Sequence, residues 1–257
     1  MKSKVYIVGA GPGAADLLTL RAASVLRVAE VVLHDDLVSQ EVLDMAPHDA
    51  HVVNVGKRCG HRGISQEQIN ALMVEHAQSG KQVVRLKSGD PAVFGRLGEE
   101  LDALCKADVP FEIVPGITAA AAAAASANVT LTDRRAASAL VLLTAHNARQ
   151  APLSESSVDA AHATFAVYMP GPDYSRTAKE LIKLGVNAGA PCVLVSHAGR
   201  ATEKVHATSL AALGSIADVA APAVLLVGEA VRAGDTRRPV QSVSLVEHSS
   251  SARRQIS

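Results

Sequence analysis

The chain has 257 residues, of which 48% are hydrophobic and 19% charged, so it is expected to fold around a sizeable core. Its 25 Lys and Arg residues balance 25 Asp and Glu residues, which excludes a uniformly basic surface but leaves local basic patches open. Aromatic residues amount to 2%, which argues against a platform for stacking nucleobases. The composition therefore predicts a globular protein with no nucleic-acid partner.

The first half alternates short apolar runs with segments of helical periodicity. We expect strands at residues 4–8, 30–33, 51–55, 82–86 and 111–114, and helices at 16–28, 39–45, from 65 onward and 97–107. Ser65 and Gln68 have the spacing of a capping box at the start of the third helix. The alanine run 119–125 is expected to form a helix whose small side chains allow close approach of backbone or ligand.

The second half repeats this alternation with different spacing. Strands are expected at residues 140–144, 165–169, 192–196 and 223–227, and a helix at 175–184. Alternating strands and helices predict an α/β fold with two domains, largely parallel sheets and a cofactor cleft between them. We place the N-terminal α/β domain at 1–128, the C-terminal α/β domain at 129–246 and a flexible polar tail at 247–257.

Cysteine usage and hydropathy give further exclusions. Cys59, Cys105 and Cys192 are far apart, so a disulfide framework or zinc ribbon is not expected. Cys59 and His61 lie close together, but no second pair follows at ligand spacing, and we predict no metal site. The apolar run after the N-terminus is too short for a signal peptide, and no window reaches the ~18 apolar residues of a membrane span. We therefore expect a cytoplasmic protein without a membrane partner.

A glycine-rich loop follows the first predicted strand. Gly9, Gly11 and Ala14 match the G-x-G-x-x-G/A pattern of dinucleotide-binding folds, and Asp35 stands 24 residues after Gly11, where a ribose-binding acid belongs. A nicotinamide or flavin site and a plain strand-to-helix turn both fit this segment. Several further loops rich in Gly, Pro and polar residues also follow strands, and the dinucleotide pattern does not explain them.

Taken together, these loops resemble the tetrapyrrole methylase family, and within it most nearly the uroporphyrinogen-III C-methyltransferases. The matching segments run in family order over about residues 3–230: Val8-Gly9-Ala10-Gly11-Pro12-Gly13, His34-Asp35-Asp36-Leu37-Val38-Ser39, Gly56-Lys57-Arg58-Cys59-Gly60, Val84-Arg85-Leu86-Lys87-Ser88-Gly89-Asp90-Pro91, Val93-Phe94-Gly95-Arg96, Val114-Pro115-Gly116-Ile117-Thr118-Ala119, Leu131-Thr132-Asp133-Arg134, Tyr168-Met169 and Pro222-Ala223. Each motif alone is weak, whereas the ordered set is specific.

The resemblance implies two α/β domains, S-adenosylmethionine (SAM) folded in the cleft between them, and a homodimer. It implies methylation of uroporphyrinogen III at C2 and C7, which gives precorrin-2 by way of precorrin-1 for siroheme or cobalamin synthesis, with S-adenosylhomocysteine as by-product. The positions that it implies for SAM contact are Pro12, Ser88, Gly89, Asp90, Val93, Thr118, Ala119, Met169, Ala198 and Ala223.

The resemblance also implies two catalytic residues, Asp35 as proton acceptor and Lys57 as proton donor. A pyrrole that attacks a methyl group must lose a proton elsewhere in the macrocycle, and a carboxylate can accept it. The residues alone leave two alternatives open, because Asp35 also suits a helix N-cap and Asp36 stands beside it.

The substrate is rich in carboxylates, so a neutral chain must gather positive charge locally. Cations in the motif loops are predicted to bind it, because guanidinium forks match carboxylates: Arg58, Arg62, Lys87, Arg96 and Arg134. For any one of them solvated surface charge is the better explanation, whereas the set as a whole favours substrate binding.

Three departures from the family pattern bear on this prediction. Ser88 replaces a usual glycine, Asp133 a usual histidine, and Pro170 follows Met169 where glycine is common. The chain starts directly at the methylase motif, which suggests a monofunctional enzyme rather than a trifunctional siroheme synthase. The remaining alternatives are a methyltransferase of a later precorrin, a nicotinamide- or flavin-dependent oxidoreductase and a catalytically silent SAM-binding protein.

Overall fold

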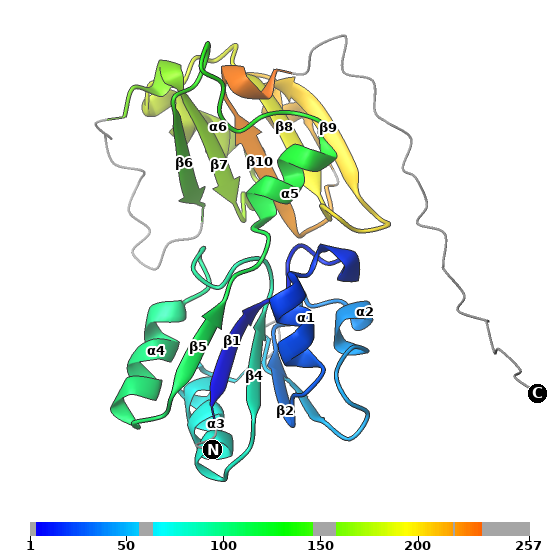
Figure 1. Cartoon of the computed structure of the whole chain (residues 1–257). Coiled ribbons are helices and arrows are strands. Elements are labelled where there is room, and N and C mark those ends of the chain that lie inside the picture. The colour runs from blue at the N-terminus through cyan, green and yellow to red at the C-terminus, as the bar shows by residue number, and fades with distance from the viewer. Residues whose placement is uncertain (1–3, 57–63, 146–157, 218, 233–257) are drawn as a thin grey trace, which may run out of the picture.

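The computed structural model describes residues 4–56, 64–145, 158–217 and 219–232, which form two sheets with helices on both faces of each (Figure 1). The first sheet is parallel throughout, in the order β3-β2-β4-β1-β5. Its strands are β1 (Val5–Gly9), β2 (Val31–His34), β3 (His51–Asn54), β4 (Val83–Lys87) and β5 (Phe111–Val114). All five match the strands predicted from the apolar runs to within one residue at each end.

Two pairs of helices cover the faces of the first sheet. On one face α1 (Leu20–Leu26) and α2 (Gln40–Leu43) pack against Val8, Val32 and Leu86. On the other face α3 (Gln66–Gln78) and α4 (Leu97–Lys106) pack against Ile7 and Leu33. Both faces of β1, β2 and β4 are buried, so these strands are largely apolar apart from Arg85 and Lys87, as is typical of parallel sheets. The predicted capping box at the start of α3 is present.

The predicted first helix is shorter than its periodicity indicates. A 3-10 turn, Ala15–Leu17, comes first, and α1 then begins at Leu20. The Thr19 side chain accepts a hydrogen bond from the Ala22 amide at 3.1 Å and so caps α1. The Gly-rich loop is therefore separated from the start of α1 by a second turn.

The second sheet has the order β6-β7-β10-β8-β9. Its strands are β6 (Ala139–Thr144), β7 (Ala163–Tyr168), β8 (Pro191–Ser196), β9 (Lys204–Ser209) and β10 (Ala223–Val227). Only β6 and β7 pair in parallel among these described strands, so the expectation of largely parallel sheets is wrong for this half. The short connection between β8 and β9 makes them an antiparallel hairpin, and the exposed, weakly apolar β9 escaped prediction.

The second sheet is also covered on both faces. The predicted helix α6 (Tyr174–Lys183) buries Tyr174, Ala178 and Leu181 against one face. On the other face lies α5 (Ala119–Ser126), the alanine helix, which packs against β7, β8 and β10 (Figure 1). By packing, α5 belongs with the second half, whereas the predicted boundary after residue 128 placed it with the first. The predicted class, α/β with a sheet in each half, is confirmed.

Candidate active site

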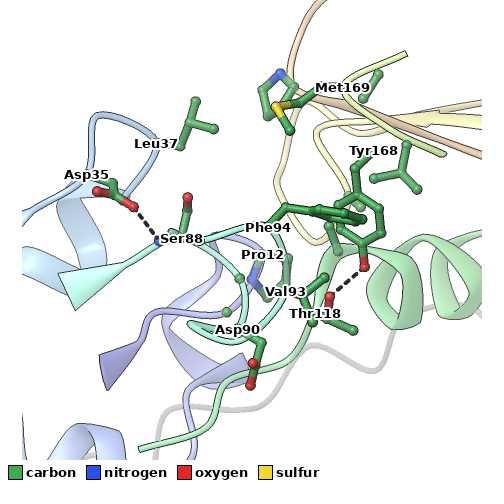
Figure 2. Close-up of a pocket in the computed structure, with 18 of the residues that line it drawn as sticks. Pro12, Asp35, Leu37, Ser88, Asp90, Val93, Phe94, Thr118, Tyr168 and Met169 are labelled. Atoms are coloured by element: carbon green, nitrogen blue, oxygen red, sulfur yellow. Dashed lines mark hydrogen bonds between the residues drawn. The ribbon is translucent and has the colours of Figure 1, made fainter. Parts of the chain in front are cut away.

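A cavity of about 210 Å³ lies between the two halves and is lined by residues of both. Figure 2 shows Tyr168 and Met169 of the second half across the cavity from Asp35, Ser88 and Pro12 of the first. The structure brings together Asp35 and every position predicted to contact SAM: Pro12, Ser88, Gly89, Asp90, Val93, Thr118, Ala119, Met169, Ala198 and Ala223. These residues come from seven separate segments of the sequence, which the fold gathers at one site.

Glycines let three loops beside the cavity pack closely against one another. A Cβ at Gly9 would lie 2.6 Å from the Gly116 Cα, and one at Gly116 would lie 2.3 Å from the Gly89 carbonyl oxygen. Gly11 and Gly89 also exchange backbone hydrogen bonds at 3.1 and 2.8 Å. The loops after β1, β4 and β5 therefore come close enough for their backbones to touch at these glycines.

This contact gives the glycine motif a different use from dinucleotide binding. In the dinucleotide fold the glycines lead directly into a helix whose N-terminus holds the pyrophosphate. Here α1 begins only at Leu20, and Gly9 is needed for the approach of two other loops. The arrangement favours the plain-turn interpretation over the nicotinamide or flavin site.

Asp90 links two of these loops. Its Oδ1 accepts a hydrogen bond from the Ala92 amide at 2.8 Å, and its Oδ2 accepts one from the Gly116 amide at 3.0 Å. The left-handed φ of 68° in this turn falls at Gly89, and Ser88 is not among the positive-φ residues. The serine that replaces the usual glycine at position 88 therefore costs no backbone strain.

Asp35 is held at the cavity wall by the neighbouring strand β4. Its Oδ1 forms an ion pair with Nη2 of Arg85, and its Oδ2 accepts a hydrogen bond from the Ser88 amide at 3.3 Å (Figure 2). Ser39, and not Asp35, caps α2. The neighbouring Asp36 accepts a hydrogen bond from Asn54 at 3.3 Å and is absent from the cavity lining. The geometry thus argues against a helix-capping role for Asp35. It also favours Asp35 over Asp36 as the acidic residue of the cavity.

Of the predicted substrate-binding cations that the structure describes, Lys87, Arg96 and Arg134, none lines the cavity. Lys87 is 3% exposed, and its Nζ lies 2.8 Å from Glu100 Oε1, so the prediction that it binds substrate is wrong. Lys87 is the last residue of the buried strand β4, and its side chain does not line the cavity. Burial, and next the charge of Arg85, lower the pKa of Lys87 below its ordinary value.

The other predicted cations differ in exposure and in their ion-pair partners. Arg96 pairs with Glu99 on the exposed start of α4, at 2.7 Å. That hydrogen bond raises the pKa of Arg96. Arg134 is exposed and stands beside Asp133, whose carboxylate forms an ion pair with Arg135. The predicted residues Lys57, Arg58 and Arg62 lie outside the described residues.

Aromatic side chains, which the sequence reasoning did not single out, form one end of the cavity. The Tyr168 hydroxyl lies 2.6 Å from Thr118 Oγ1 and accepts a hydrogen bond from the Ala120 amide at 3.2 Å. It thereby caps α5, whose N-terminal Thr118 makes no capping bond of its own. The ring of Phe94 lies 5.0 Å from that of Tyr168, between their centroids. Both residues belong to family motifs, and each stands next to a predicted SAM contact, Val93 or Met169. That position was the one sign in the sequence that they line the cavity.

Arg200 connects the two halves at the cavity. It lies in the β8–β9 loop, and its Nε donates to the Pro12 carbonyl oxygen at 3.1 Å while Nη2 donates to the Leu37 carbonyl oxygen. Its side chain covers Gly13, where a Cβ would lie 2.5 Å from Arg200 Nε. No motif contained Arg200, so the sequence offered no signal for this contact.

Comparison with known proteins identifies the family. The family model described as Tetrapyrrole (Corrin/Porphyrin) Methylases matches residues 4–214. The chain belongs to this family. Siroheme synthases of Zymomonas mobilis subsp. mobilis and Actinobacillus succinogenes are each 43% identical to it, over 89% and 90% of this chain and 49% of theirs. The chain thus spans about half the length of the curated relatives it matches.

Solved structures of this methylase family resemble the chain over nearly its whole length. A uroporphyrin-III-C-methyltransferase from Thermus thermophilus is 36% identical, with a TM-score of 0.76 over 90% of this chain and 94% of that protein. The same enzyme has been solved complexed with S-adenyl homocysteine. A cobalt precorrin-4 methyltransferase is 32% identical, with a TM-score of 0.77 over 89% of this chain and 95% of that protein.

The described residues of this methylase include neither a metal-binding cluster nor a membrane-spanning helix. Within the described ranges no group of three or more His, Cys, Asp or Glu is placed to hold a metal ion, and Cys59 and His61 lie outside those ranges. In the same part of the chain, no helix has both the length and the apolar character needed to cross a bilayer.

Proposed function

We propose that this tetrapyrrole methylase transfers methyl groups from SAM to C2 and C7 of uroporphyrinogen III and so forms precorrin-2 by way of precorrin-1. The observation that supports this most is that Asp35 and all ten predicted SAM-contacting positions line the same cavity. The likeness to a uroporphyrin-III-C-methyltransferase over 90% of the chain supports the same substrate. The proposal includes a homodimer, as the family resemblance implies, and the cytoplasmic location expected from the sequence.

The cavity lining suits the mixed polar and apolar character of SAM. Ala119, Ala198 and Ala223 leave backbone close to the cavity, and Val93 adds an apolar wall. Asp90 offers a carboxylate to the ammonium group of the amino-acid portion, and its two bonds to backbone amides hold it in one orientation. When bound, SAM supplies a methyl group already activated by its sulfonium, so the chief task of the protein is alignment.

Asp35 is proposed to take the proton that the macrocycle must lose. Its carboxylate is 27% exposed, so it faces the cavity while one oxygen stays on Arg85. An aspartate held by a guanidinium and an amide has little freedom to turn away from the substrate. Lys57 as proton donor, and Arg58, Arg62, Arg96 and Arg134 as carboxylate partners, remain part of the proposal.

One assay tests this function. Purified protein is incubated with labelled SAM and enzymatically made uroporphyrinogen III under reducing, anaerobic conditions, and mono- and dimethylated products are sought. Asp35→Asn is expected to lose transfer while retaining affinity for S-adenosylhomocysteine. Asp36→Asn is the matched control and is expected to remain active, because the Asp36 side chain bonds to Asn54 outside the cavity lining. Equal losses in the two variants would contradict the assignment.

Other outcomes favour the alternatives. Methylation of a later precorrin instead of uroporphyrinogen III would agree with the likeness to the cobalt precorrin-4 methyltransferase, which is 32% identical. Saturable SAM binding without transfer to any tetrapyrrole would indicate a silent binding protein. Binding of NADH without affinity for SAM would restore the oxidoreductase.

A further inference from the structure

A cluster of buried charges lies beneath Asp35. Arg85 and Lys87 are on β4 and are 2% and 3% exposed, and Glu100 on α4 is 0% exposed. With the partly exposed Asp35, the cluster contains two cations and two carboxylates. Glu100 does not line the cavity, so direct contact with a ligand does not account for it.

Glu100 fixes both cations through a single oxygen. Its Oε1 accepts hydrogen bonds from Arg85 Nε at 2.9 Å and Lys87 Nζ at 2.8 Å, with Gln66 Nε2 at 3.4 Å. The remaining nitrogens of Arg85 are also engaged. Nη1 donates to the carbonyl oxygens of Leu33 and Leu86, and Nη2 donates to Asp35 Oδ1. The guanidinium therefore has one orientation, and that orientation sets where the Asp35 carboxylate lies.

The charge balance depends on Glu100. Without it, two buried cations two residues apart on β4 would share Asp35 as their remaining carboxylate within this cluster. Uncompensated buried charge is strongly unfavourable, and the surrounding groups rearrange to neutralise it. Asp35 is the partly exposed member, so it is the one free to move inward and away from the cavity. A buried ion cluster is weak evidence for a gain in stability over apolar residues, which points to a role in placement.

We propose that Glu100 is a positioning residue for Asp35, acting through Arg85 and by neutralising Lys87. This inference rests on the proposed function, in which Asp35 accepts the proton. Glu100 touches neither substrate nor SAM. Its effect is expected on turnover and on the place of the Asp35 carboxylate, and not on the affinity for SAM.

The test uses Glu100→Gln, which keeps the shape of the side chain and removes its charge. We expect kcat for methyl transfer to fall at least about tenfold, while the Kd for S-adenosylhomocysteine stays within about twofold. Asp102→Asn is the matched control, because it removes one carboxylate from the exposed side of α4. It is expected to leave both quantities unchanged. A kcat for Glu100→Gln within twofold of the wild type overturns the inference.

Coupling to Asp35 separates positioning from a general structural effect. In an Asp35→Asn background, adding Glu100→Gln is expected to change the residual rate less than about twofold, because the group that it positions is already gone. A further tenfold loss there would show that Glu100 acts independently of Asp35 and would overturn the inference.

Two additional measurements keep the test decisive if Glu100→Gln folds poorly or the wild type has another substrate. The double variant Lys87→Met/Glu100→Gln removes one buried cation with the carboxylate, leaves Arg85 paired with Asp35, and is expected to recover kcat to within about threefold. A folded double variant with less than a tenth of wild-type kcat contradicts the proposal.

A crystal structure of Glu100→Gln, or of the double variant if the single one does not fold, reports on the position of Asp35 independently of activity. Displacement of Asp35 from Arg85 in the single variant, or its retention in the double variant, supports the proposal, and the opposite result overturns it. Absence of methyl transfer by the wild type alone would overturn the proposed function instead.

Discussion

Replacing Arg200 with lysine tests whether the contact between the two halves shapes the SAM site. Arg200 donates from Nε to the Pro12 carbonyl oxygen at 3.1 Å and from Nη2 to that of Leu37, so one guanidinium holds two loops of the first half. A lysine keeps the charge but cannot reproduce the planar fork. The distance between the cavity walls that contain Ala198 and Pro12 is then expected to be no longer fixed.

The size of the effect follows from the two hydrogen bonds. Bonds to a charged donor contribute about 1.5–3 kcal/mol each when buried, and solvent competition at the half-buried Arg200 is expected to reduce this roughly by half. The pair then contributes about 1.5–3 kcal/mol, which corresponds to at least about tenfold weaker binding if the ligand requires the closed arrangement.

The assay is titration calorimetry with S-adenosylhomocysteine on wild type, Arg200→Lys and a control. Arg176→Lys is the matched control, because Arg176 is a 73% exposed residue of α6 that pairs with Glu180. Gly13→Ala gives an independent perturbation, since its Cβ would occupy the space of the Arg200 side chain. A Kd for Arg200→Lys within twofold of the wild type, with unchanged thermal unfolding, would refute the reasoning.

Three further predictions concern single side chains. Asp90→Ala removes two acceptors from the Ala92 and Gly116 amides and should weaken binding of S-adenosylhomocysteine by at least about tenfold in calorimetry, with less effect on the KM for the tetrapyrrole. Arg134→Ala should mainly raise the KM for the tetrapyrrole by several-fold, and equal effects of both variants on both ligands would count against the assignments. Burial raises the pKa of Cys192 to about 12, so above pH 9 the thiol ionises in the unfolded chain but not in the folded one. This contribution to stability is complete below pH 9 and should fall by about 1.4 kcal/mol by pH 10, and urea unfolding of Cys192→Ala should lack that part of the decline.

The strands of the first half were predictable because burial on both faces makes them largely apolar runs, as in β1 and β2. The break between the first turn and α1 was not, because helical periodicity continues through Thr19 while its side-chain cap starts a new helix. The exposed strand β9 carries little apolar signal, and its pairing is set by the hairpin with β8.

The residues around the cavity were predictable from the ordered motifs, because each motif is a short local pattern in the sequence. Lys87 was misjudged because its partner Glu100 stands 13 residues away on a helix, and no local pattern marks that pairing. Arg200 was missed for the same reason, because its acceptors are backbone carbonyls 188 and 163 residues away.

The arrangement of the sheets in the sequence has a consequence for the order in which the protein forms during synthesis. The strands of the first sheet all precede residue 115, and those of the second all follow residue 138. Domains generally fold as units while the ribosome extends the chain, so we expect the first sheet to form before the second half has emerged. The Asp35–Arg85–Glu100 contacts would then form early, whereas the cavity itself must wait for Tyr168, Arg200 and Ala223. A nascent chain is therefore expected to have its acidic group in place long before it has a binding site for the methyl donor.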